Sequence, residues 1–358
     1  MAGQKVALVA GANGVVGRRL VEELATLDDW RVIGVGRRAN ASIPGVQMLG
    51  VDLLDPADVA RMLGPRLGVT HLFHAAYQDR PTWAELVPPN VAMLDNVLNA
   101  VTGPALRHVS LMQGYKVYGG HLGAFKTPAR ETDPYFMPPE FMVDQQRLLE
   151  ARQQGQPWSW SAMRPAVVGG TALGNPLNLV VAIAVYASLS KEAGLPLRFP
   201  GKPGAYDKIV EMTDAGLLAR ATIWAATNLG SANQAYNINN GDVFRWSEMW
   251  PSIARYFEME VAPPLPLQLT TVMADKEGAW RAMQERHGLA RIPYKDVSSW
   301  AFADFVWSWD YDMFADGSKA RRHGFVEHVQ TSAMLFAQFD QLRAAGVIPR
   351  APMQAGLG

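Results

Sequence analysis

The chain has no cysteine among its 358 residues, which excludes disulfides, thiolate metal sites and cysteine nucleophiles. Its seven histidines show no metal-ligand spacing such as His-Glu-x-x-His, which argues against a metal enzyme. Neither sign of charge is in excess, because 33 basic residues balance 33 acidic ones. No global field therefore favours a nucleic acid or an anionic membrane, and we expect neither as a partner.

Long hydrophobic runs are also missing, and we expect no leader segment. The most apolar stretch, residues 179–189, is about half the roughly 20 residues that a spanning helix needs, so we interpret it as a buried helix. The first expected strand begins within a few residues of Met1, which leaves no room for a signal peptide and predicts a cytoplasmic protein. With 49% hydrophobic residues, the chain can bury one large core or two unequal ones.

Apolar runs alternate with helical patterns as far as Pro165. Because strands that alternate with helices form parallel sheets, this order predicts an α/β fold with a doubly wound parallel (Rossmann) sheet. Ligands of such sheets bind at the carboxyl ends of the strands. The expected strands are 5–10, 31–36, 47–51, 71–75, 107–112 and 159–164, with helices near 14–27, 56–63, 83–101 and 138–153.

The pattern changes beyond Pro165. Seven of the eleven tryptophans lie after residue 220, and the regular alternation gives way to longer helical pieces. We expect residues 1–165, with a returning strand near 205–240, to form a dinucleotide-binding domain. Residues 166–204 and 241–358 are expected to form a smaller, mostly helical substrate lobe.

A glycine-rich turn follows the first expected strand and leads into an amphipathic helix. Glycines let the backbone approach a dinucleotide pyrophosphate, while the N–H groups and the positive end of the helix face its charge. An ordinary strand-to-helix turn is the alternative interpretation. The expected cofactor contacts in this turn are Gly11, Asn13, Gly14, Val15, Val16 and Gly17.

Arg37 and Arg38 end the second strand, about twenty residues after Gly17, where an NAD-preferring protein usually carries an acidic residue. Guanidinium groups suit a 2′-phosphate, so NADP(H) is favoured over NAD(H), and an ordinary solvated turn is the alternative. Further cofactor contacts are expected after the later strands. These candidates are Asp52, Leu53, Ala75, Ala76, Met112, Gln113, Pro165, Val167 and Val168.

The acid that many enzymes of this architecture use, Tyr-x-x-x-Lys, is missing, because none of the ten tyrosines has a lysine at the fourth following position. The fifth strand leads instead to Lys116, which stands between Tyr115 and Tyr118. If this segment is extended, Lys116 and Tyr118 point the same way and Tyr115 points the other. A lysine here is suited to bind the nicotinamide ribose or to lower the pKa of a nearby phenol, and a solvated lysine is the alternative.

With these motifs, the chain resembles the progesterone 5β-reductase and iridoid synthase family, an atypical branch of the extended short-chain dehydrogenases. The resemblance implies NADPH/NADP+ as cofactor and reduction of an enone or enal by hydride transfer to its β-carbon. It matches Lys116 to the catalytic lysine of the family. The matching segments are 11–17, 35–38, 70–73, 114–118, 164–165, 196–201, 235–246, 298–304 and 316–321.

The chain departs from this family at the tyrosine segment. The family's Asn-Phe-Tyr-Tyr aligns with residues 140–143, so Met142 and Val143 stand where tyrosines are expected. Neither side chain donates a proton, and loss of a comparable oxyanion donor costs on the order of 100- to 1,000-fold in rate. Three explanations stay open. Tyr118 or Tyr115 supplies the phenol, a tyrosine of the other lobe such as Tyr206 or Tyr186 supplies it, or the chemistry needs no such acid.

An apolar cavity is expected for a small apolar carbonyl substrate. The candidate substrate contacts are Phe141, Met142, Val143, Asn178 and Tyr206. The leading hypothesis is an NADPH-dependent reductase of an apolar α,β-unsaturated carbonyl compound. An NADPH-dependent ketone or aldehyde reductase and a dinucleotide-binding regulator without turnover are the alternatives, and a homodimer stays open.

Overall fold

The computed structural model describes residues 4–39, 43–174 and 177–350. The chain divides into two compact units. The first consists of Met1–Ala166, Thr213–Asn240 and Ala315–His328, and the second of Val167–Met212, Gly241–Phe314 and Val329–Gly358.

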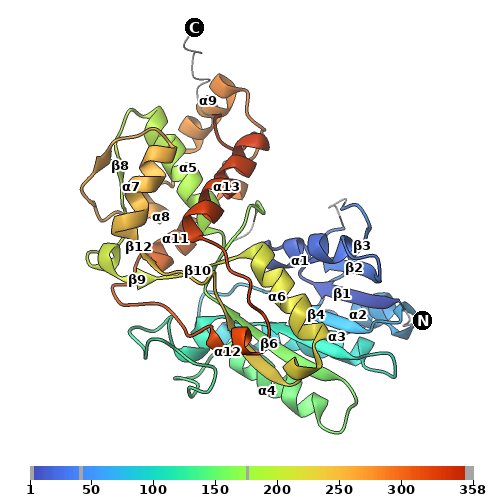
Figure 1. Cartoon of the computed structure of the whole chain (residues 1–358). Helices are drawn as coiled ribbons and strands as arrows, with labels where there is room; N and C mark the ends of the chain where they lie inside the picture. The colour runs from blue at the N-terminus through green and yellow to red at the C-terminus, as the bar shows by residue number, and fades with distance from the viewer. Residues whose placement is uncertain (1–3, 40–42, 175–176, 351–358) are drawn as a thin grey trace. The chain divides into compact units, whose positions relative to one another are not determined.

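A parallel sheet of seven strands forms the centre of the first unit (Figure 1). Its strands lie in the order β11-β6-β5-β4-β1-β2-β3, and every neighbouring pair is parallel. The expected doubly wound α/β fold is therefore confirmed. The strands are β1 (Lys5–Ala10), β2 (Trp30–Gly36), β3 (Val46–Gly50), β4 (His71–His74), β5 (His108–Met112), β6 (Ser159–Pro165) and β11 (Gln234–Ile238).

Helices cover both faces of this sheet, because its central strands are apolar on both sides. In β1, Leu8 packs in one core cluster and Val9 in another. The helices α2 (Pro56–Leu63), α3 (Trp83–Val101) and α4 (Phe141–Gln153) supply the first cluster. The helices α1 (Val15–Ala25) and α6 (Ala215–Thr227) pack together over the second. Short 3-10 turns η1 (Pro65–Leu67), η2 (Tyr115–Tyr118) and η4 (Leu229–Ser231) connect these elements.

The strands and helices expected up to Pro165 agree with the observed elements to within a few residues. The largest difference is at the start of α4, which was expected near residue 138 and begins at Phe141. The helix begins there because the Glu140 side chain accepts the N–H of Val143 and caps the first turn. The sequence Pro138–Pro139 lies just before this cap.

The assignment of residues 241–358 to the substrate lobe is wrong for Ala315–His328, which belong to the first unit. Here α12 (Ser318–Arg322) covers the edge strand β11. Lys319 Nζ donates to the Ala235 carbonyl at 2.9 Å, and the Tyr236 hydroxyl lies 2.8 Å from His323 Nδ1. Such a cover shields the unpaired backbone N–H and C=O groups of an edge strand. No local sequence pattern predicts that this segment returns to the sheet. The return to the first unit also begins later than expected, at Thr213.

The second unit is mostly helical. Its longer helices are α5 (Leu179–Glu192), α7 (Trp246–Tyr256), α9 (Glu277–His287), α11 (Trp300–Val306) and α13 (Thr331–Ala344). Shorter elements are α8 (Leu269–Val272), α10 (Tyr294–Val297), η3 (Ala205–Asp207), β7 (Val167–Gly169), β8 (Leu197–Arg198), β9 (Ile209–Val210), β12 (Phe244–Arg245) and β13 (Val261–Ala262). Strand β10 (Met212–Asp214) carries the chain from the second unit into the first.

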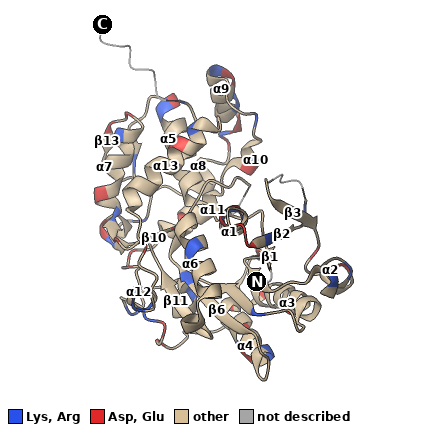
Figure 2. Cartoon of the chain, turned by 45° about the vertical axis from the view of Figure 1, so that its right-hand side comes forward, with Lys and Arg blue, Asp and Glu red and all other residues tan. Residues whose placement is uncertain are grey.

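The buried helix expected at 179–189 is confirmed, because α5 is buried from Leu179 through Leu189. Within the described ranges, no helix combines the length and the apolar character that crossing a membrane requires. Three tryptophans of this unit pack around Phe199, whose ring lies 5.3–6.0 Å from those of Trp246, Trp250 and Trp307. Lys and Arg are intermixed with Asp and Glu along the ribbon rather than gathered by sign (Figure 2).

The packing of α1 on β1 yields a prediction. A Cβ atom at Gly17 would lie 2.2 Å from the Gly11 carbonyl oxygen, so a side chain there forces the turn apart. We expect Gly17→Ala to lower the free energy of unfolding by about 1–3 kcal/mol, the usual cost of overpacking. Gly103→Ala is the matched control, since nothing lies within 4 Å of a Cβ there. Urea unfolding followed by circular dichroism measures both, and equal stabilities would contradict the close packing.

Candidate functional site

The turn between β1 and α1 brings bare backbone to the carboxyl edge of the sheet. Gly11 has a φ of 85°, and a Cβ there would lie 2.6 Å from the Ala75 carbonyl oxygen, so only glycine fits. The N–H groups of Gly11 and Ala12 both donate to the Val35 carbonyl at 2.9 Å, which holds the turn against β2. The first N–H groups of an α-helix have no acceptor within the helix, so the start of α1 is suited to bind an anion.

Three of the predicted cofactor segments meet at this turn. Ala75 and Ala76 follow β4 and lie directly against Gly11. Asn13 Nδ2 donates to the carbonyl of Arg38 at 3.0 Å, which joins the glycine turn to the end of β2. Sequence positions more than sixty residues apart are thus brought to one edge of the sheet, where this fold binds its ligands.

The two arginines after β2 are exposed. In the described part of the chain, neither the Arg37 nor the Arg38 guanidinium forms an ion pair or a side-chain hydrogen bond. Both donor groups are therefore available to an external phosphate next to the glycine turn.

The pair after β3 splits into an exposed carboxylate and a core side chain. Asp52 is exposed, and its Oδ1 accepts the N–H of Leu54 at 3.0 Å. Leu53 packs in the core cluster, and its carbonyl accepts from Asn96 Nδ2 at 3.0 Å. Of the two predicted contacts, only Asp52 thus presents a side chain to solvent.

Gln113, which follows β5, uses both ends of its side-chain amide in hydrogen bonds. Gln113 Nε2 donates to the Met142 carbonyl at 2.7 Å, and its Oε1 accepts from Arg164 Nε at 3.0 Å. This amide joins the end of β5 to the start of α4, so the structure gives it a positioning role. Met112 is half-buried beside Met163.

Pro165 closes β6, and its carbonyl oxygen lies 3.6 Å from the position of a Cβ on Gly114. This distance is an ordinary van der Waals contact, so the end of β6 packs against the start of the turn that carries Lys116. Val167 and Val168 are half-buried and begin the second unit.

The segment that carries Lys116 is not extended. Tyr115–Tyr118 form the 3-10 turn η2, in which residues three apart share a side. The rings of Tyr115 and Tyr118 accordingly lie 6.0 Å apart. The condition under which Lys116 and Tyr118 would point the same way, an extended segment, is therefore not met. Glycines at both ends permit the tight turn, and Gly119 has a φ of 82° that favours glycine.

Lys116 is half-buried, with Nζ 4.6 Å from the centre of the Trp83 ring. An ammonium over an indole face gains a cation–π attraction. Burial lowers the pKa of Lys116, while the negative charges of Glu140 and Asp79 favour its protonated form. The lysine is thus a positive charge held in a partly desolvated place, where it acts more strongly than in water.

The Tyr118 hydroxyl is engaged in a buried network. It donates to Asn237 Oδ1 at 2.6 Å and accepts from Arg164 Nη1 at 3.0 Å. Burial raises the pKa of Tyr118 to about 12. These bonds do not favour Tyr118 as a proton donor to a substrate. Tyr115 is buried beside it.

Arg164 lies at the centre of this network, a role that sequence reasoning missed. It is 1% exposed, and its guanidinium also donates to Gln146 Oε1 at 3.1 Å. Longer contacts of 3.4 Å reach the Glu131 carbonyl and the Tyr135 hydroxyl. An arginine inside a sheet strand is the signal that the sequence offered, because a buried charge needs several partners.

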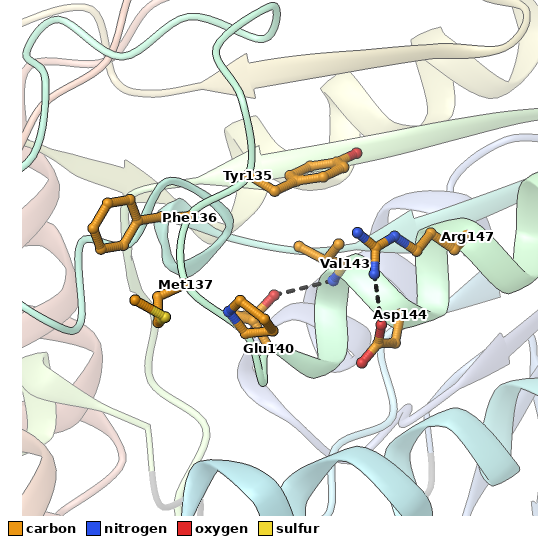
Figure 3. A pocket seen from close by; sticks show the side chains of 8 residues that line it. Tyr135, Phe136, Met137, Glu140, Val143, Asp144 and Arg147 are labelled. Atoms are coloured by element: carbon orange, nitrogen blue, oxygen red, sulfur yellow. Dashed lines mark hydrogen bonds and ion pairs between the residues drawn. The ribbon is translucent and has the colours of Figure 1, made fainter.

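The start of α4 holds the three predicted substrate residues in three different settings. Phe141 is buried, with its ring 5.7 Å from that of Tyr77. Met142 Cε lies 4.0 Å from the position of a Cβ on Gly114, so Met142 faces the Lys116 turn. Val143 lines a cavity of about 160 Å³ (Figure 3). The other lining residues are Tyr135, Phe136, Met137, Pro138, Glu140, Asp144 and Arg147.

Glu140 is a second residue whose role sequence reasoning missed. It is 6% exposed, and its Oε2 accepts the Val143 N–H at 3.0 Å. Its Oε1 is buried and has no hydrogen-bond partner among the residues that the structure describes. Burial raises the pKa of Glu140 to about 7, although the backbone N–H groups of Met142 and Val143 and the charge of Lys116 favour the carboxylate. The signal in the sequence was an acidic residue at the position of the family's asparagine, just before the helix.

In the second unit, the predicted residues have partners of their own. Asn178 caps α5, because its Oδ1 accepts the Val181 N–H at 3.2 Å and its Nδ2 donates to the Ala172 carbonyl at 2.8 Å. This engagement speaks against a substrate contact. Tyr206 is half-buried against Phe199, with ring centres 5.1 Å apart. The Tyr186 hydroxyl donates to the Arg198 carbonyl at 3.1 Å.

Similar sequences span nearly the whole chain. A family model described as a PRISE-like Rossmann-fold domain matches residues 52–349. An (S)-8-oxocitronellyl enol synthase of Camptotheca acuminata is 33% identical over 367 residues, which cover 97% of this chain and 94% of that protein. A 3-oxo-Δ(4,5)-steroid 5β-reductase of Arabidopsis thaliana is 31% identical over 368 residues, with the same coverage of 97% and 94%.

Solved structures share the fold at much lower identity. A UDP-N-acetylglucosamine 4-epimerase from Methanobrevibacter ruminantium has a TM-score of 0.69 and 15% identity, over 96% of this chain and 99% of that one. A UDP-glucose 4-epimerase from Thermus thermophilus, in complex with NAD, has a TM-score of 0.66 and 19% identity, over 95% and 99%. At these identities the likeness concerns the architecture.

The bonds of the Tyr118 hydroxyl yield a prediction. Tyr118→Phe removes one buried hydrogen bond from Arg164 Nη1 and one from Asn237 Oδ1, so we expect a loss of about 1–3 kcal/mol in the free energy of unfolding. Tyr135→Phe is the control, because its hydroxyl makes only a 3.4 Å contact with Arg164. Urea unfolding of the two variants measures the difference, and a stable Tyr118→Phe would refute the structural role of this hydroxyl.

Proposed function

The chain belongs to the PRISE-like Rossmann-fold family, and on this premise we propose that it is an NADPH-dependent reductase of an apolar α,β-unsaturated carbonyl compound. Relatives named as a steroid 5β-reductase and an enol synthase, together with NAD-bound neighbours in fold, make it an oxidoreductase of the short-chain dehydrogenase/reductase superfamily. The observation that carries the finer proposal is Lys116, held half-buried over Trp83 just beyond the carboxyl end of β5.

The first unit offers what a nicotinamide dinucleotide phosphate needs. Gly11 and Gly17 bring backbone close to a pyrophosphate at the start of α1. The exposed guanidinium groups of Arg37 and Arg38 suit the 2′-phosphate that distinguishes NADPH from NADH. When bound, this cofactor supplies a hydride to the substrate.

Lys116 provides the charge that the reaction requires. When an enone gains a hydride at its β-carbon, an electron pair moves onto the carbonyl oxygen, and this oxygen becomes negative. A fixed positive charge near that oxygen stabilises the transition state more than the ground state. The negative charge of Asp79 favours the protonated form of Lys116, against the larger effect of burial.

The direct test follows NADPH oxidation by the purified protein with a panel of apolar enones, enals and ketones, and identifies the products. We expect saturated carbonyl products from the enones and enals. Alcohol products would instead support a ketone or aldehyde reductase. Tight binding of NADPH without oxidation by any panel member would support a regulator.

Lys116→Met is the variant that connects this turnover to the site. The side chain keeps its length and loses its charge, so we expect kcat to fall by about 100-fold or more, as for other oxyanion donors. Cofactor affinity should stay close to that of the parent, which fluorescence titration with NADPH measures. Unchanged turnover would eliminate Lys116 as the catalytic residue.

Arg37 and Arg38 predict the cofactor preference. Loss of a charged hydrogen bond to a phosphate costs about 1.5–3 kcal/mol, so the double variant Arg37→Ala/Arg38→Ala should raise the Kd for NADPH by about 10- to 100-fold. The Kd for NADH should change far less, because NADH lacks the 2′-phosphate. Arg66→Ala, at an exposed arginine after α2, is the matched control. Equal losses for both cofactors in the double variant would contradict the phosphate assignment.

A further inference from the structure

The reduction consumes a proton as well as a hydride, and the residues beside Lys116 leave its source open. Met142 and Val143 stand at the tyrosine positions of the resembled family. The Tyr118 hydroxyl is bonded to Arg164 and Asn237. We propose that the carboxyl group of Glu140 is the proton donor of this reaction, an inference that rests on the proposed function.

The two oxygens of Glu140 differ in their surroundings. Oε2 accepts the Val143 N–H and so caps α4. Oε1 is buried, and no described residue bonds to it. Burying a charged carboxylate oxygen without a hydrogen-bond partner costs free energy. A protonated carboxyl group carries no charge, and its O–H group can donate to an acceptor that enters the cavity. The carbonyl oxygen of a substrate is an acceptor of the right kind.

The carboxyl group of Glu140 lies beside position 143, one of the two positions at which the resembled family carries tyrosines. Glu140 and Val143 stand three residues apart at the start of α4 and line the same cavity (Figure 3). Residues at this spacing lie on one side of a helix. The space at position 143 that a larger side chain would fill is therefore bordered by Glu140. Gln113 bonds the first turn of α4 to the end of β5, three residues before Lys116.

The surrounding charges suit a group that gives up and regains a proton. Lys116 on η2 favours the carboxylate, and Asp144 on α4 favours the protonated form. Burial dominates and places the pKa of Glu140 at about 7, so both forms are populated near neutral pH. A general acid works best when its pKa lies near the working pH.

The step balances with NADPH as the reductant. A hydride forms the new C–H bond at the β-carbon, the C=C electron pair forms a new double bond between the α-carbon and the carbonyl carbon, and the C=O pair moves onto the oxygen. The Oε1–H bond of Glu140 breaks, and its proton forms the O–H bond of an enol. The enol then takes a proton from water at the α-carbon and releases the proton on oxygen. Solvent returns a proton to the Glu140 carboxylate, which Lys116 stabilises until then.

Glu140→Gln is the test, because glutamine keeps the size and the capping oxygen of the side chain and has no acidic proton. We expect kcat with an enone to fall by about 100-fold, the usual contribution of a general acid. The wild-type rate should fall as the pH rises through about 7, because only the protonated form donates. This limb of the pH profile should be missing in Glu140→Gln, whereas the affinity for NADPH should be unchanged.

An infrared measurement on the protein without cofactor checks the protonation directly. The difference spectrum between wild type and Glu140→Gln should contain a carboxylic acid C=O band below neutral pH that disappears above it. A carboxylate band at every pH would overturn the proposal. If Glu140→Gln does not fold, Glu140→Asp retains a helix cap, and it should lower kcat while keeping the pH limb.

Glu285→Gln, the same exchange at an exposed glutamate of α9 that does not line this cavity, is the matched control. It should leave kcat and the pH profile near those of the wild type. A full rate in Glu140→Gln together with a loss in Tyr135→Phe would make the Tyr135 phenol the donor and overturn the proposal. A wild-type protein that oxidises no NADPH with any enone would reject the proposed function itself, whereas an active wild type with an equally active Glu140→Gln would reject only the role of Glu140.

Discussion

A single buried cation, the Arg164 guanidinium, connects the elements that build the site. Burying such a charge is tolerated only where its donors are satisfied, and at 1% exposure Arg164 depends wholly on protein partners. Those partners are Gln113 after β5, Tyr118 in η2 and Gln146 in α4. Lys116 lies in η2, and Glu140 caps α4. The positions of both residues therefore depend on these hydrogen bonds.

In this network Tyr118 has a structural role, whereas Lys116 and Glu140 are the groups suited to catalysis. The Tyr118 hydroxyl is hydrogen-bonded to Arg164 and Asn237, whereas Glu140 is not among the partners of Arg164 in the described part of the chain. Burial shifts the pKa of Lys116 down and that of Glu140 up, so that the two groups approach each other in acidity. Groups whose pKa values are shifted by burial and by a charged neighbour are often found at functional sites.

Local patterns predicted much of the first unit. The strands of the sheet and the Gly11–Gly17 turn were recognised because alternation, glycine spacing and apolar runs act over a few residues. The resemblance to the progesterone 5β-reductase and iridoid synthase family is confirmed by the family match. Two features escaped such reasoning. The segment Ala315–His328 joins the sheet through contacts distant in the sequence, and η2 turns where an extended segment was considered.

The sequence by itself determined the fold class, the exclusion of cysteine chemistry, and the absence of a tyrosine at positions 142 and 143, because these follow from residue types and short spacings. Only the tertiary structure decided which polar groups beside Lys116 are already bonded. Tyr118 and Asn237 are 119 positions apart in the chain, yet their side chains share a hydrogen bond. The unbonded oxygen of Glu140 likewise results from burial, which no local pattern specifies.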